Sequence, residues 1–99
     1  MSINSYLGSH ISDLSDIISR LGDEFTSHDF LKKFAKEYEE HYIDFLYSYR
    51  GTGAFQTVHS QIALFLSENE KSLGIFKTNK EKSKNIFGEE DYIQGWRKI

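Results

Sequence analysis

The feature that most constrains this chain is a run of large apolar residues at helical spacing in its first half. Between positions 30 and 49 they follow one another at steps of one, three or four: Phe30, Leu31, Phe34, Tyr38, Tyr42, Phe45, Leu46 and Tyr49. Such spacing draws one stripe along an α-helix, and no Gly or Pro interrupts positions 28–50. Thr26 followed by Asp29 is typical of a helix N-terminal cap. The pattern therefore predicts one long helix over 28–50.

Two shorter segments share this helical spacing. A helix is predicted over about 10–21, where the apolar positions are Ile11, Leu14, Ile17, Ile18 and Leu21. After the break at Gly51-Thr52-Gly53, another is predicted over 57–67, with the apolar stripe Val58, Ile62, Phe65 and Leu66. Residues 1–9 are rich in polar and small side chains, so we expect a flexible N-terminus ahead of a single domain over 10–99.

The last quarter of the chain changes character. Residues 75–78 are typical of a short strand, residues 79–85 form a polar, lysine-rich segment, and apolar side chains return at Ile86-Phe87 and near Trp96. A strand, a charged loop and a return strand make a β-hairpin. The sequence therefore predicts a mainly helical α+β fold, with three helices followed by a small C-terminal hairpin.

Length and composition limit what such a chain can be. Ninety-nine residues, 38% of them hydrophobic, support one core. The absence of cysteine excludes disulfides and thiolate metal sites. There is no run of 18 apolar residues and no leader with a basic start and an apolar centre. We therefore expect a cytoplasmic protein with no membrane partner.

The residue types that catalysis needs are present without a catalytic pattern. The histidines at 10, 28, 41 and 59 form no H-E-x-x-H motif, and the acids at 89–91 are adjacent, so they lack the contrasting environments of an acid–base pair. No phosphate-binding glycine loop or G-x-S-x-G turn occurs. We expect a binding protein rather than an enzyme, with no cofactor and no metal.

Charge is distributed unevenly along the chain. The formal net charge is −3, but residues 1–53 hold five basic and nine acidic side chains, whereas residues 54–99 hold seven and six. Between Lys71 and Lys84, five lysines accompany one acid, Glu81. Clustered lysines are typical of phosphate contacts. Lysines on an edge strand also keep it solvated and discourage aggregation, so both interpretations stay open.

Helices followed by a basic hairpin resemble a winged helix-turn-helix domain. The resemblance implies that helix 57–67 enters the major groove of double-stranded DNA while the hairpin, or wing, contacts the backbone or the minor groove. It assigns helix contacts to Gln56, Thr57, His59, Ser60 and Gln61, and phosphate contacts to Lys71, Lys77, Lys80, Lys82 and Lys84. The implied role is a transcription regulator or accessory subunit. The helix itself departs from the usual pattern because it contains no Arg or Lys.

A protein–protein interaction module is the alternative. Twelve of the fifteen aromatic residues lie between positions 25 and 87, and one narrow stripe of helix 28–50 does not bury all of its tyrosines. Tyrosine is enriched at interfaces. The interface would use Tyr38, Tyr42, Tyr47 and Tyr49. The partner would be a second copy in a homodimer, or a nucleic-acid enzyme that a small acidic inhibitor blocks.

Overall fold

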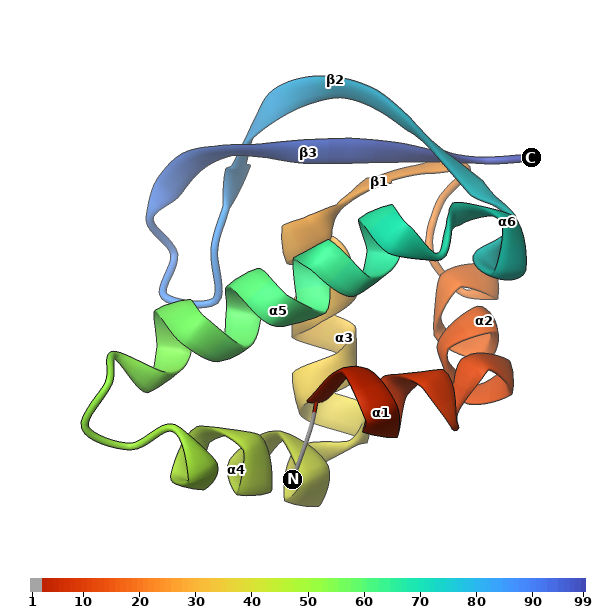
Figure 1. The fold of residues 1–99 in the computed structure, drawn as a ribbon. Coiled ribbons are helices and arrows are strands. Elements are labelled where there is room, and N and C mark those ends of the chain that lie inside the picture. Colours follow the sequence, from red (N-terminus) through yellow and green to blue (C-terminus); the bar gives the residue numbers. More distant parts are fainter. Residues whose placement is uncertain (1–2) are drawn as a thin grey trace.

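Over residues 3–99, which the structure describes, this computed structural model contains six helices and one three-stranded sheet (Figure 1). The helices are α1 (Ile3–Gly8), α2 (Ile11–Ser19), α3 (Ser27–Glu37), α4 (Glu39–Ser48), α5 (Ala54–Glu68) and α6 (Glu70–Leu73). The strands are β1 (Glu24–Thr26), β2 (Ile75–Lys84) and β3 (Glu90–Lys98). The predicted α+β class is confirmed, with twice the predicted number of helices in the described part.

The sheet is antiparallel, with β3 between β1 and β2. The predicted hairpin is confirmed as β2 and β3, although residues 79–84, predicted to be loop, continue the strand. Strand β1 was not predicted, because three residues are too few to show alternation. Its Phe25 lies opposite Trp96 of β3, and both side chains are buried. The strand thereby ties the start of α3 to the hairpin.

A bulge bends the hairpin near its middle. Two residues of β2, Thr78 and Asn79, lie opposite the single Gly95 of β3. A Cβ at Gly95 would stand 2.6 Å from Oγ1 of Thr78 and 2.8 Å from the carbonyl oxygen of Asn79, so only glycine fits there. Bulges increase the local twist and bend a strand. In Figure 1 the hairpin accordingly bends, and its tip lies beside the first turn of α5.

The prediction of one helix over 28–50 is wrong, because the helix breaks at Tyr38. Tyr38 has φ −119° and ψ 46°, so it ends α3 and precedes α4. The bend lets Phe34 and Phe45 stack, with ring centroids 6.2 Å apart and planes 7° apart. A straight helix would place these two rings about 16 Å apart along its axis. Burial of both rings in one core therefore overrides the continuous helical pattern.

The predicted flexible N-terminus over 1–9 is also corrected. Helix α1 packs against α5, and its Ile3 and Leu7 are buried in the core. Met1 and Ser2 lie outside the described residues. Two apolar side chains four positions apart were enough to anchor a short helix that has little helical stripe of its own. The domain that was predicted to begin at residue 10 therefore includes α1.

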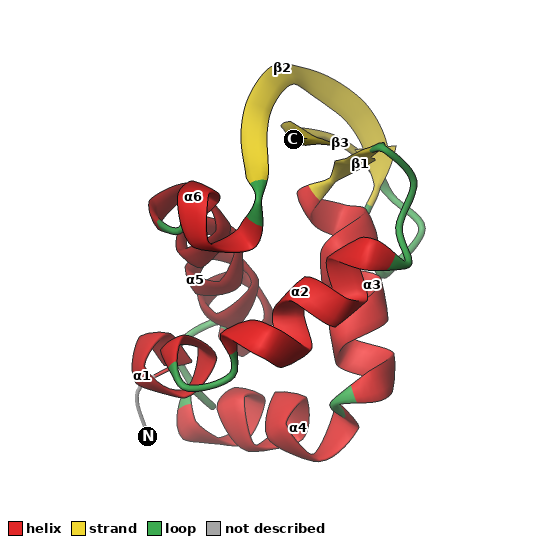
Figure 2. Ribbon diagram, turned by 90° about the vertical axis from the view of Figure 1, so that its right-hand side faces the viewer, coloured by secondary structure: helices red, strands yellow, loops and turns green. Residues whose placement is uncertain are grey.

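The other two predicted helices are present with shifted ends. The helix predicted over 10–21 is α2, and Figure 2 shows it beside α3. The helix predicted over 57–67 begins three residues earlier, at Ala54, directly after Gly53 with its left-handed φ of 70°. Its predicted stripe is confirmed, because Val58, Ile62, Phe65 and Leu66 are all buried. This stripe fixes which side of α5 is left to face the hairpin.

Candidate functional site

A cleft of about 760 Å³ lies between α5, the first turns of α3 and the hairpin. We call it the α5–hairpin cleft. One wall is formed by Phe55, Gln56, His59, Ser60, Ala63, Leu64 and Ser67 of α5. Facing it are Asn85, Phe87, Glu89, Asp91, Ile93 and Gln94 of the hairpin, with Ser27, His28 and Leu31 of α3 between the two. The bend at the Gly95 bulge gives this space its second wall.

Three large apolar side chains stand exposed around the cleft. Phe55, Leu64 and Phe87 are 46%, 56% and 55% exposed. The rings of Phe55 and Phe87 meet edge to face, with centroids 5.0 Å apart, so the hairpin tip closes one end of the cleft. Phe55 and Leu64 lie off the buried stripe of α5. Their position off the apolar stripe can be read from the sequence, and this signal could have indicated the cleft.

The inner wall contains two histidines from different helices. Nε2 of His59 lies 2.6 Å from the hydroxyl of Tyr42, and the two rings stack with centroids 5.8 Å apart. Burial lowers the pKa of His59, and nearby His28 lowers it further. His28 is itself buried, and its Nδ1 has no hydrogen-bond partner within residues 3–99. The wall is therefore polar, and its burial favours the neutral form of His59.

The charges that line the cleft are few and mostly acidic. They are Lys77, Glu89 and Asp91. Helix α5 contributes none, because it has no Lys or Arg and its acid, Glu68, does not line the cleft. A phosphate backbone seated here would face two carboxylates and a single ammonium group. The cleft is better suited to an apolar group with a positive charge beside it.

The helix residues predicted to contact nucleic acid divide into two sets. Gln56, His59 and Ser60 line the cleft. Thr57 and Gln61 do not: the Thr57 hydroxyl donates to the carbonyl of Thr52 at 3.2 Å, and the Gln61 amide oxygen accepts from the Tyr49 hydroxyl at 3.5 Å. The predicted helix contacts thus do not form one free surface.

The predicted lysines are also separated. Only Lys77 lines the cleft, whereas Lys80, Lys82 and Lys84 are exposed in the second half of β2 and Lys71 is exposed on α6. Opposite the three β2 lysines stand Gln94, Tyr92 and Glu90. Nζ of Lys82 lies 3.6 Å from a carboxylate oxygen of Glu90. The return strand therefore brings acids that the linear lysine run did not reveal.

The four tyrosines predicted to form an interface have different surroundings. Tyr42 is buried and held by His59, while Tyr38 and Tyr49 are partly buried against the core. Tyr47 is 64% exposed and carries Arg50 over its ring, 4.2 Å from the centroid. Of this predicted interface, Tyr47 alone offers a largely free side chain.

Comparisons with protein-family models, with curated proteins and with solved structures gave no match. Within residues 3–99, no three His, Asp or Glu side chains are grouped so that they could hold a metal ion. The helices of this part are too short or too polar to cross a bilayer. The residues of the cleft therefore carry the functional interpretation by themselves.

Proposed function

We propose that this chain is a non-catalytic binding domain whose α5–hairpin cleft holds an apolar segment of a partner protein. The observation that carries the proposal is the exposure of Phe55, Leu64 and Phe87 around one concave site. Exposed apolar groups gathered in one place are typical of interaction sites. A volume of about 760 Å³ falls among binding clefts, which span roughly 300–1,000 Å³. A cleft of this size accommodates a few large side chains rather than a whole domain.

The charges around the cleft indicate the chemistry of the segment. Glu89 and Asp91 stand on the hairpin side, opposed within the cleft by Lys77 alone. The whole chain is also acidic, at −3. Opposite charge at a rim speeds association and selects partners. The segment should therefore carry Lys or Arg beside its apolar anchors.

The architecture is compatible with such a role. Helices α2, α3 and α5 followed by the β2–β3 hairpin resemble a winged helix-turn-helix domain, with α1, α4 and α6 as additions. A fold of this kind does not decide function, which depends on the site. Here the space between the third of these helices and the hairpin is apolar and acidic, which favours a protein ligand.

Double-stranded DNA gripped by helix 57–67 and the hairpin is the second candidate function. The observation that favours it is the row of exposed lysines at positions 80, 82 and 84 of β2. It ranks second because the cleft-facing side of α5 supplies hydrogen-bonding groups such as Gln56 but no cation. Specific and non-specific DNA binding both depend on neutralised phosphates.

A displayed library of random peptides, selected on the immobilised chain, tests the proposal. Enriched peptides should combine Leu, Phe or Trp with a neighbouring Lys or Arg. Leu64→Asp should lose their binding by more than about tenfold, because a charge then occupies the apolar wall. Ile43→Asp is the matched control, since Ile43 is equally exposed on α4 outside the cleft. Lack of enrichment, or equal losses in both variants, would refute the proposal.

Sedimentation of the same proteins tests whether a second copy of the chain, rather than a different protein, occupies the cleft. A monomer at high concentration agrees with a separate partner. A dimer that Leu64→Asp dissociates and Ile43→Asp does not would show that the cleft is filled by another copy, and the proposal of a different partner protein would then be wrong.

A further inference from the structure

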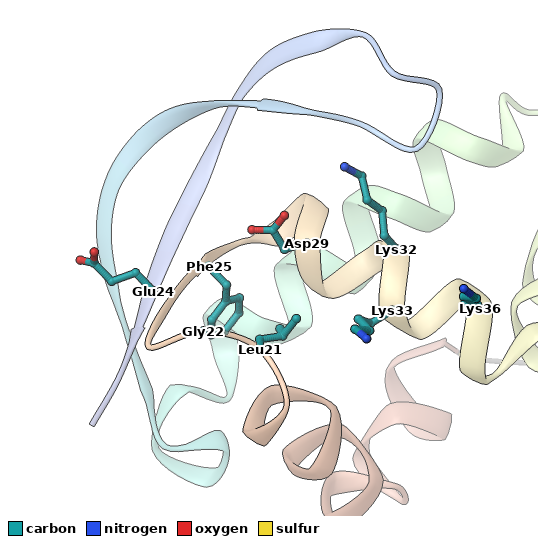
Figure 3. A pocket seen from close by; sticks show the side chains of 8 residues that line it. All are labelled: Leu21, Gly22, Glu24, Phe25, Asp29, Lys32, Lys33 and Lys36. Atoms are coloured by element: carbon teal, nitrogen blue, oxygen red, sulfur yellow. The ribbon is translucent and has the colours of Figure 1, made fainter.

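The outer side of α3 carries a cluster of cations on a protein that is acidic overall. Lys32, Lys33 and Lys36 are exposed and border a recess of about 380 Å³ between α3 and the segment from Leu21 to Phe25. Figure 3 shows the three amines around this recess. We call these residues the α3 lysine face. It lies outside the α5–hairpin cleft, whose walls it does not join.

No carboxylate among the described residues forms an ion pair with these lysines. Two carboxylates line the recess, and neither forms an ion pair with the lysines. That of Asp29 accepts from the Thr26 backbone N–H at 2.9 Å in the cap of α3, and Figure 3 shows the Glu24 side chain directed away from the lysines. Like charges one helical turn apart destabilise a helix. An external anion would relieve that repulsion.

Glu37, the acid closest to the lysines in sequence, is also engaged. Its carboxylate accepts from Arg20 at 2.7 Å, and this contact lowers the pKa of Glu37. The charges of Lys33 and Lys36 lower this pKa further, so Glu37 offsets part of the cluster while its hydrogen bonds go to Arg20.

The second half of β2 crosses the start of α3 and carries further exposed lysines on its outer face. Oγ of Ser83 lies 3.0 Å from Oγ1 of Thr26, the N-cap of α3, so the strand passes over the start of that helix. Lys82 and Lys84 flank Ser83 and therefore lie on the opposite, outer face of the strand. Lys32 is about 9 Å along the helix from Thr26. In Figure 3 its side chain extends toward the hairpin.

We infer that the α3 lysine face contacts the phosphate backbone of double-stranded DNA. Lys80 on the outer face of β2 would flank this contact, whereas Lys82 and Lys84 contribute less because both stand beside Glu90. A duplex is favoured over a single strand because single strands bind on several stacked aromatic side chains. The exposed rings of the hairpin, Phe76, Phe87 and Tyr92, lie at the start of β2, at the tip and on β3, so they do not form one row for stacking. The chain would then hold DNA on this face and a partner protein in the cleft.

The test compares two double variants that change the charge equally. Lys32→Glu with Lys36→Glu removes two of the proposed contacts. Arg50→Glu with Arg97→Glu is the control, because these exposed residues, after α4 and near the end of β3, line neither the recess nor the cleft. Binding of a fluorescent duplex is measured by anisotropy across a salt series. Circular dichroism checks that both variants fold, and the same positions changed to Gln replace a variant that does not.

We expect the α3 variant to weaken duplex binding at low salt by more than about tenfold and to lower the salt slope by about 2. The control should change both by clearly less. Absence of duplex binding by the parent at low salt, or equal losses in the two variants, would overturn the inference. So would tighter binding of a single strand or of anionic vesicles than of the duplex. None of these results depends on the peptide selection, so the two proposals fail separately.

Discussion

The hydroxyl of Tyr42 and Nε2 of His59 lie 2.6 Å apart and join α4 to α5. The sequence had assigned both residues to external partners, Tyr42 to a protein interface and His59 to DNA. In the fold each is the other's hydrogen-bond partner, and their rings stack. A contact between residues 17 positions apart on different helices leaves no periodic signal in the sequence.

The burial of His59 makes stability depend on pH. Burial lowers the pKa of His59 below its ordinary value near 6.5, so the folded chain binds the proton less readily than the unfolded chain. The free energy of unfolding should therefore fall as pH decreases through the range below about 6.5. Replacing His59→Gln should flatten this dependence. Urea unfolding at several pH values between 5 and 8 measures it, and an unchanged slope in the variant would contradict the prediction.

The order of helices and the hairpin was predicted from the sequence because both depend on local periodicity. The stripe of Val58, Ile62, Phe65 and Leu66 faces the core as expected. The break at Tyr38 was not predicted, since it serves the stacking of Phe34 on Phe45, which only the folded core provides. Helical propensity is a weak constraint that such packing overrides.

The candidate site was predicted less well, for a similar reason. The hydrogen-bonding side chains of α5 do line the cleft, but the sequence did not indicate that Phe55 and Phe87 would meet across it. It also assigned all cationic contacts to residues 71–84. Lys32, Lys33 and Lys36 were assigned no contact, because the cap of α3 and the Arg20–Glu37 pair, which engage the neighbouring acids, are visible only in three dimensions.

The role of α1 can be tested at Leu7. This side chain is fully buried, although a flexible N-terminus was expected there. Leu7→Ala should lower the free energy of unfolding by about 2–5 kcal/mol, the usual effect of a cavity in a packed core. Asn4→Ala on the exposed side of the same helix is the control and should change it by less than about 0.5 kcal/mol. Equal, small effects would indicate that α1 does not pack against the core.

The bend of the hairpin can be tested at Gly95. A methyl group there would collide with the Asn79 backbone and the Thr78 side chain, so Gly95→Ala should destabilise the domain by about 1–3 kcal/mol. It should also weaken peptide binding, because the bulge positions the second wall of the cleft. Gly8→Ala has open space around its Cβ and serves as the control. If Gly95→Ala retained both stability and binding, the close approach at the bulge would be dispensable.

The indole of Trp96 connects the sheet to α3 beneath the cleft. Its Nε1 donates to Oγ of Ser27 at 2.9 Å, and both residues are buried. Ser27→Ala would leave that N–H without its acceptor, and a buried unpaired donor costs about 1–3 kcal/mol. Ser60→Ala, an exposed serine of the same cleft, should cost nothing measurable. Because Trp96 is the sole tryptophan, its fluorescence follows the unfolding of both variants in urea. Equal midpoints would mean that the Trp96–Ser27 hydrogen bond does not stabilise the fold.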